Sequence, residues 1–384
     1  MNKKAIKMLC VGDLLLYKTN NERVFDLVSP VFKSADIVVG QAEGAYTTRP
    51  HITCAQGGGA DMAPARTGDP SVFKDIKAAG FQVLTLANNH LFDGGIPGVE
   101  DTLAELKGLG VATVGVGMNL DEARRPAVIE RNGVRVGFLN YNCVGPKITW
   151  ANAQKPGCAY VQIFTVYEME NPGPGEKPTG IFTVAEFGSL KAMTEDIRKL
   201  RPLCDVLAVK FHKGAGFVEA KIEQYEFQVS YAAIDAGADV VLADHAHILK
   251  GIEVYRGKPI YHGMNHFAMS FPYAPITDSA RISKMVANYK EHHGFDADPE
   301  TVKYMYPTRD TLKTIVASLT ITNGKITRAG YLPCLIDMKT EQPEILKHDA
   351  RGEEVFGYID RITKAAGLNT RYDWEGDEVV FLRE

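Results

Sequence analysis

The sequence has few cysteines and no apolar run long enough to cross a membrane. Its six cysteines are dispersed over 384 residues without a C-x-x-C pair, so we expect free, buried thiols in a reducing compartment. Lys7 and Asp13 interrupt the apolar start MNKKAIKMLCVGDLLL, which we interpret as a first strand and not as a signal peptide. A membrane span needs roughly 18 to 20 apolar residues, so none is predicted, and a cytoplasmic location is expected.

The sequence also lacks an excess of basic residues and the common nucleotide-binding motifs. The formal net charge is -4 at pH 7 without a basic block, which argues against binding to nucleic acid or to an acidic membrane. The segment GGGA at 57–60 does not open a convincing helix after a strand, and KGAGF at 213–217 lacks the third glycine of a dinucleotide motif. No G-x-S-x-G elbow occurs either. These absences argue against nicotinamide, P-loop and serine-hydrolase chemistry.

The sequence does contain apolar runs that alternate with amphipathic segments of helical length. The predicted strands are 5–12, 36–42, 82–87, 111–116, 204–211 and 239–243. The predicted helices are 21–34, 70–79, 97–109, 186–200, 217–236 and 351–366. Hairpins are expected around Asn132-Gly133, at 251–263 and around Asn323-Gly324. This order predicts an α/β protein whose sheet is covered on both faces, with the hairpins adding antiparallel strands.

We expect one domain over 1–384 and find no internal repeat. The Gly- and Pro-rich segment 145–180 is predicted to be an insertion loop, and 270–310 an irregular or locally helical excursion. Residues 340–384 are interpreted as a C-terminal extension of this domain.

Five of the apolar runs stop at side chains that bind divalent metals. Those side chains are Asp13, Glu43, the series Asn88-Asn89-His90, His212, and the pair His245 and His247. Taken singly, each has an ordinary explanation, such as a turn, a cap or a solvated loop charge. Because ligands of open α/β sheets bind beyond the carboxyl ends of strands, the recurrence at five strand ends favours one shared metal centre.

Several blocks resemble, in order, those of the CapA-type poly-γ-glutamate (capsule) biosynthesis family, a branch of the calcineurin-like metallophosphatases. The resemblance covers residues from about 5 to about 340. The blocks that carry it are VGDLLL, QAEGAYTT, LANNHLFDGG, VKFHKGAGF, ADHAHILKGIEVYRGKPIYHGMNHF and RDTLKTIVASLTITNGKITRAGYLP. The resemblance implies a two-sheet αββα sandwich with a centre for two divalent metal ions.

The same resemblance implies the role of each site residue. Asp13 and His247 would bind the first metal, Glu43 would bridge both metals, and Asn89, His212 and His245 would bind the second. His90 would stand beside the bridging hydroxide, with Asp93 orienting its ring. Ligands of nitrogen and oxygen without thiolate suit Mn, Fe, Zn or Co and do not select one of them.

The chain departs from the family pattern at several positions. Leu15 stands where most metallophosphatases have a histidine ligand, so the first metal is expected to be one ligand short. Ala243, Asp244 and Ala246 replace family residues around the histidine pair. The segment YHGMNHF carries His262 and His266, where the family reads closer to Tyr-Ser-Leu-Gly-Asn-Phe. We predict that substrate is contacted by a set drawn from three segments: His51, Arg66, Lys213, His262, Asn265 and His266, with Arg49 as a further candidate.

The resulting hypothesis is a binuclear metal-dependent hydrolase. A metal-bridging hydroxide would attack an amide or a phosphate ester of a small polar or poly-γ-glutamate-like substrate. One alternative is a non-catalytic accessory or binding protein of poly-γ-glutamate or cell-wall polymer metabolism. Another is a degenerate metallophosphatase fold that retains one metal for structure. The sequence predicts no oligomeric state.

Overall fold

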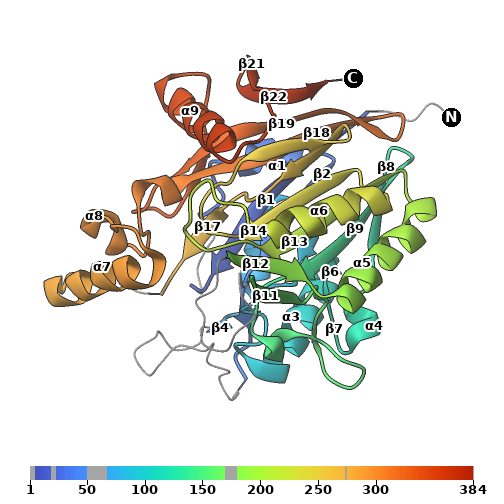
Figure 1. Ribbon diagram of the computed structural model, residues 1–384, viewed down its shortest axis with the longest axis horizontal. Coiled ribbons are helices and arrows are strands. Elements are labelled where there is room, and N and C mark those ends of the chain that lie inside the picture. Colours follow the sequence, from blue (N-terminus) through green and yellow to red (C-terminus); the bar gives the residue numbers. More distant parts are fainter. Residues whose placement is uncertain (1–4, 19–22, 50–66, 169–179, 273–274, 384) are drawn as a thin grey trace.

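Two large β-sheets form the centre of the protein. The computed structural model describes residues 5–18, 23–49, 67–168, 180–272 and 275–383 (Figure 1). Within these residues, the larger sheet has the order β21-β22-β19-β18-β1-β2-β5-β6, with β17 beside β1 and β20 beside β19. Its strands are β21 (Asp373–Glu375), β22 (Glu378–Arg383), β19 (Lys325–Ile336), β18 (Lys313–Thr322), β1 (Ile6–Leu16), β2 (Ile37–Ala42), β5 (Val83–Thr85), β6 (Ala112–Val114), β17 (His266–Ser270) and β20 (Pro343–Ile345).

The smaller sheet has the order β15-β16-β14-β13-β9-β8. Its strands are β15 (Ile252–Tyr255), β16 (Lys258–Tyr261), β14 (Val240–His245), β13 (Val206–Lys213), β9 (Val134–Asn142) and β8 (Ala127–Arg131). Short pairs join β3 (Ala45–Tyr46) to β4 (Thr67–Gly68), β7 (Val116–Gly117) to β10 (Gly157–Cys158), and β11 (Ile163–Glu168) to β12 (Gly180–Ala185).

Helices lie outside the two sheets (Figure 1). They are α1 (Ser29–Ser34), α2 (Val72–Ala79), α3 (Gly95–Gly108), α4 (Leu120–Ala123), α5 (Phe187–Leu200), α6 (Gln224–Ala236), α7 (Ser279–His293), α8 (Pro299–Val302) and α9 (Ala350–Ala365), with short 3₁₀ turns at Lys147–Thr149, Arg201–Leu203 and Arg309–Leu312. None of the described helices is both long and apolar enough to cross a bilayer.

The alternation of side chains along β1 explains how the layers pack. Met8 and Cys10 join a core that also contains Phe138 of β9 and Leu242 of β14, so the two sheets pack face to face. Leu9 and its neighbours on the opposite face pack against α1, α2 and α3. A third core lies between the smaller sheet and the helices α5 and α6. A strand buried on both faces must be apolar throughout, which is the pattern that the sequence showed.

The α/β class and the three hairpins are confirmed, but some predicted boundaries were wrong. The helix expected at 217–236 begins only at Gln224, because Glu223 and Glu226 form a capping box there. Within the helix expected at 21–34, α1 covers only Ser29–Ser34, with a proline in its first turn. The predicted first strand was too short, since β1 continues to Leu16 by pairing with β17.

The predicted insertion loop and the C-terminal extension both contain paired strands. The segment 145–180 was expected to be a loop, yet Ile163–Glu168 pairs with Gly180–Ala185 as an antiparallel ladder. In the C-terminal region 340–384, β22 pairs with β19 and so belongs to the larger sheet. The helical part of 270–310 is α7 and α8. Five cysteines are free and buried as expected, and Cys54 lies outside the described residues.

Candidate metal centre

The predicted ligands from separate segments meet where strands of the two sheets end. Asp13 lies in β1 and Glu43 directly follows the parallel neighbour β2. His212 lies near the end of β13, and His245 ends the parallel neighbour β14. The larger sheet therefore supplies the carboxylates and the smaller sheet the imidazoles. Five residues from four segments form this centre once His247, just beyond β14, is included.

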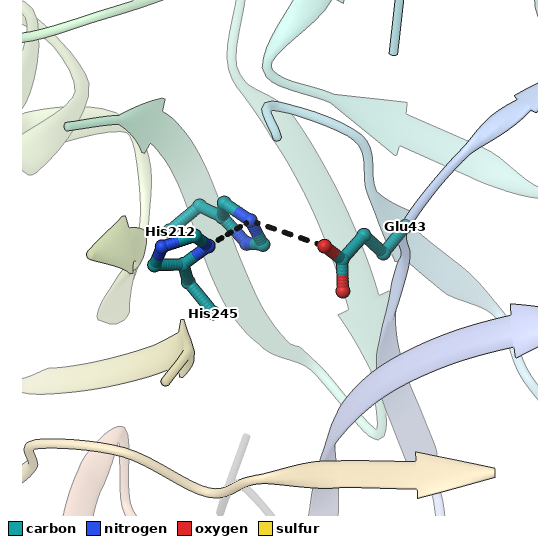
Figure 2. Close-up of side chains that lie close together, drawn as sticks. All are labelled: Glu43, His212 and His245. Carbon is teal, nitrogen blue, oxygen red and sulfur yellow. Dashed lines mark hydrogen bonds and ion pairs between the residues drawn. The ribbon is translucent and has the colours of Figure 1, made fainter. Parts of the chain in front are cut away.

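The ligand atoms form two groups that share one carboxylate. Glu43, His212 and His245 form one group, which Figure 2 shows, and Asp13, Glu43 and His247 form the other. Within each group one ligand atom from every residue lies within 4.8 Å of the others. Each carboxylate oxygen of Glu43 lies 3.6 Å from an imidazole nitrogen, Oε1 from Nε2 of His212 and Oε2 from Nε2 of His247. Glu43 thus has one oxygen directed to each group.

Buried atoms without hydrogen-bond partners show that these residues suit a cation. Among the described residues they include Oδ1 of Asp13, both carboxylate oxygens of Glu43, and Nδ1 of His212 and of His247. Buried polar atoms are normally paired, and leaving a charged one unpaired costs several kcal/mol. Oxygen and imidazole nitrogen are the donors that divalent transition metals bind. The donor atoms of each group therefore suit a divalent cation.

Burial keeps two histidines of the centre in the neutral form that can bind metal. It lowers the pKa of His245 to about 4 and holds the pKa of His212 well below its usual value. Both rings are therefore neutral near pH 7 and offer a lone pair. Burial, and next the charge of Glu43, raises the pKa of Asp13. Burial alone would also raise the pKa of Glu43, but the imidazoles, His247 first, lower it.

Asn89, His90 and Asp93 lie beside the group formed by Glu43, His212 and His245. Oδ1 of Asn89 lies 2.6 Å from Nε2 of His212. Nδ1 of His90 lies 2.8 Å from Oδ2 of Asp93, and its Nε2 lies 3.9 Å from Oε1 of Glu43. The side chain of His90 is 33% exposed, whereas that of His212 is fully buried. His90 thus reaches from the solvent side toward the centre with its other nitrogen held by a carboxylate. Asn88, also buried, holds this loop by donating to the carbonyls of Ala42 and Leu86.

Sequence reasoning did not identify the ion pair that supports the centre. Nζ of Lys210 lies 2.8 Å from Oδ2 of Asp244, and both side chains are buried. The same Nζ donates to the carbonyl of Val11 at 2.6 Å, which joins β13 to β1. A lysine inside the otherwise apolar run LAVKF was the signal for this contact. Asp244 lies one residue before His245 on β14, and Lys210 lies two residues before His212 on β13.

The predicted substrate residues are not all at the centre. His51 and Arg66 lie outside the described residues. Arg49 forms ion pairs with Glu100 and Asp101 of α3. The remaining predicted residues are buried: Lys213, His262, Asn265 and His266.

Two of the buried residues belong to an internal charge network. Nζ of Lys213 lies 3.3 Å from Glu226 and 3.4 Å from Nδ1 of His262, whose Nε2 lies 3.0 Å from Glu253. Asn265 donates to backbone carbonyls of the chain. The polar groups of Lys213, His262 and Asn265 are thus engaged inside the protein, and their contact with substrate stays a prediction. His266 differs from them and is considered below.

Comparison with known proteins gives a consistent set of relatives. A family model described as "Bacterial capsule synthesis protein PGA_cap" matches residues 7–270. The PGA biosynthesis protein CapA of Bacillus subtilis is 26% identical over 323 residues, covering 80% of this chain and 75% of that protein. The capsule biosynthesis protein CapA of Bacillus anthracis is 25% identical over 291 residues, covering 73% of this chain and 63% of that protein.

A "Probable polyglutamine synthesis accessory protein" of Mycobacterium tuberculosis is 31% identical over 185 residues, covering 47% of this chain and 43% of that protein. The chain thus spans three quarters of the B. subtilis relative and less than two thirds of the other two. Among solved structures, a hypothetical protein from Thermus thermophilus matches with a TM-score of 0.45 and 13% identity, covering 85% of this chain and 98% of that one. A likeness at that TM-score carries no argument about the fold.

Proposed function

The chain belongs to the bacterial capsule synthesis protein family PGA_cap, and from this premise we propose that it is a hydrolase dependent on two divalent metal ions. Its substrate in this proposal is a small polar molecule or a glutamyl polymer that carries an amide or a phosphate ester. We further propose that the chain is one domain, with its two packed sheets and outer helices forming a sandwich of the calcineurin-like metallophosphatase type.

One observation carries the proposal. Glu43 is buried, its two carboxylate oxygens lack hydrogen-bond partners, and each faces a different histidine-containing group. A carboxylate placed in this way suits a bridge between two cations. Asp13 and His247 complete one group, while His212 and His245 complete the other. We propose Asn89 as a further ligand of the second cation, because its Oδ1 lies beside His212 Nε2.

The roles of the chain's own residues follow from their positions. Two divalent ions, when bound, supply a water of lowered pKa and stabilise negative charge that develops on the substrate. The half-buried His90 is placed to donate a proton to the leaving group from its Nε2. Asp93 fixes the other ring nitrogen and stabilises the protonated ring. His90 and Asp93 are therefore the proposed catalytic and positioning residues.

The non-catalytic alternative rests on the relatives' names. The names of the two Bacillus relatives refer to PGA or capsule biosynthesis, and the mycobacterial relative is called a probable accessory protein of polyglutamine synthesis. An accessory protein could hold poly-γ-glutamate through its carboxylates without cleaving it. The donor set of the centre would then bind metal, but His90 would have no effect on any reaction.

Elemental analysis and a substrate panel test the proposal together. Purified protein is expected to hold close to two divalent ions per chain, and chelation should abolish hydrolysis that the same metal restores. The panel includes phosphate monoesters, phosphate diesters, γ-glutamyl amides and poly-γ-glutamate. Absence of bound metal would overturn the proposed centre. Two bound ions with no hydrolysis, combined with binding of poly-γ-glutamate, would favour the accessory role.

A further inference from the structure

The candidate cation site formed by Asp13, Glu43 and His247 has fewer protein ligands than the site formed by Glu43, His212 and His245. Asn89 lies beside His212 and so adds a possible ligand only to the latter site. Leu15, two residues after Asp13, supplies no donor and packs in an apolar cluster with Tyr306. A cation bound by Asp13, Glu43 and His247 would have one protein ligand fewer than the cation at the other site.

His266 is a buried imidazole without a hydrogen-bond partner. The residue is 1% exposed, and neither Nδ1 nor Nε2 has a partner in the described part of the chain. Burial, and next the neighbouring His247, lower its pKa to about 3, although the Glu43 carboxylate and the Thr311 carbonyl act in the opposite direction. A neutral ring that is buried with both nitrogens unpaired is costly and needs a physical explanation.

The sheet places this ring beside the first group. His266 is the first residue of β17 and pairs in register with Asp13 of β1. Because paired residues of neighbouring strands point to the same face, the two side chains lie on the same side of the sheet. The register shifts directly after this pair, and such irregularities often redirect side chains near functional sites. The ring centroids of His266 and His247 are 5.7 Å apart.

The backbone that carries His266 is held closely against β1. A side chain at Gly12 would place its Cβ 1.8 Å from the carbonyl oxygen of Asn265, so glycine is required for this approach. The backbone carbonyl of Asn265 accepts a hydrogen bond from the Asp13 N–H at 3.1 Å. The side-chain Oδ1 of Asn265 accepts one from the His266 N–H at 2.7 Å. Asn265 also donates to the carbonyls of Thr311 and Lys313. The strand is therefore fixed on both sides, while the imidazole itself is not.

We propose that His266 is an additional protein ligand of the cation held by Asp13, Glu43 and His247. It supplies from β17 the imidazole that Leu15 does not supply from β1. The inference rests on the proposed two-metal centre. The His266 nitrogens are not part of the group whose atoms all lie within 4.8 Å, so the ring turns toward the cation on binding. The turn has to replace only the ring's approach to the Thr311 carbonyl.

The test measures metal binding and not catalysis. His266→Phe keeps the volume and the apolar surroundings of the ring but removes both nitrogens. Tyr306→Phe is the matched control, because its ring lies 5.4 Å from that of His266 in the same buried pocket and carries no proposed ligand. Competition titrations with a chromophoric chelator and Mn²⁺ or Zn²⁺ give the two dissociation constants. Absorption spectra of the Co²⁺-loaded proteins report the ligand set.

We expect His266→Phe to weaken the more weakly bound cation by at least about tenfold and to change the cobalt spectrum. The tighter cation and the Tyr306→Phe protein should be unaffected. Unchanged constants and spectra in His266→Phe, with two ions bound, would overturn the inference and leave the two-metal centre intact. An equal loss in Tyr306→Phe would also overturn it, because packing alone would explain the effect. A wild-type chain that binds no ion would instead refute the proposed function. If His266→Phe does not fold by circular dichroism, His266→Leu, which also lacks any metal-binding atom, provides the same comparison.

Discussion

The backbone N–H of His245 donates a hydrogen bond to Oδ2 of Asp13 over 2.9 Å, although 232 positions separate the two residues in the sequence. This bond joins β14 of the smaller sheet to β1 of the larger one. It fixes one oxygen of Asp13, while the other, Oδ1, has no hydrogen-bond partner among the described residues. The two sheets are thus held in register at the point where their ligands meet.

Removal of bound metal is expected to destabilise the protein. Asp13 and Glu43 are both buried and their charges repel each other, so a cation that binds them stabilises the folded state. At a free metal concentration a hundred times the dissociation constant, the gain is about 2.7 kcal/mol per site. Urea unfolding with metal and with chelator measures the difference. Equal midpoints in the two conditions would contradict the prediction.

Replacement of His90 by Gln should abolish turnover and leave metal bound. General acid catalysis contributes about 10² to 10⁴ in rate, and His90 is placed beside Glu43 without belonging to either ligand group. Rate measurements and elemental analysis on the same sample provide the test. Unchanged turnover would reject the role of His90, and a loss of metal would show that it acts as a ligand.

The buried pair of Lys210 and Asp244 predicts an asymmetric response to mutation. Lys210→Met leaves the Asp244 carboxylate buried without its partner, which typically costs about 3–5 kcal/mol of unfolding free energy. The double variant Lys210→Met/Asp244→Leu should be clearly more stable than that single variant. Lys258→Met, which removes a half-exposed partner of Asp239, serves as the control and should cost at most about 1 kcal/mol. Urea unfolding of the four proteins checks the order.

Gly12→Ala should lower stability and metal content together. The new Cβ would lie 1.8 Å from the carbonyl oxygen of Asn265, and the strand that carries His266 would have to move. Gly357→Ala in α9 meets nothing within 4 Å and is the matched control. It should stabilise the helix by roughly 0.5–1 kcal/mol. A Gly12→Ala protein as stable and as metal-loaded as the wild type would contradict the close approach.

A change in pH should alter the stability difference between the wild type and His262→Gln. Burial, and next the charge of Lys213, lower the pKa of His262 from 6.5 to about 4. Between these values the unfolded state binds a proton that the folded state does not, so wild-type stability contributed by His262 falls as the pH falls. The variant lacks this loss. Its free energy of unfolding should therefore rise relative to that of the wild type by up to roughly 3 kcal/mol between pH 7 and pH 4. Parallel slopes in chelator-treated urea unfolding would contradict the assignment.

Periodicity predicted the strands and hairpins of this chain because sheets buried on both faces need uninterrupted apolar runs. The candidate site residues were predicted by one rule, that polar residues at strand ends converge, together with the family resemblance. That rule does not measure distance, so it did not separate His212, which faces Glu43, from Lys213, which turns to Glu226 on the opposite side. Nor did it give the pairing of Lys210 with Asp244, since partners 34 positions apart on neighbouring strands depend on register.

The position of β1 between β2 on one edge and β17 with β18 on the other has a consequence for synthesis. β1 and β2 leave the ribosome long before His266–Ser270 and Lys313–Thr322, so the nascent chain carries an unpaired apolar edge for most of its translation. Such distant pairings make folding slow and the incomplete chain prone to association. Fragments that stop before Thr322 should therefore collect as aggregates in the cell.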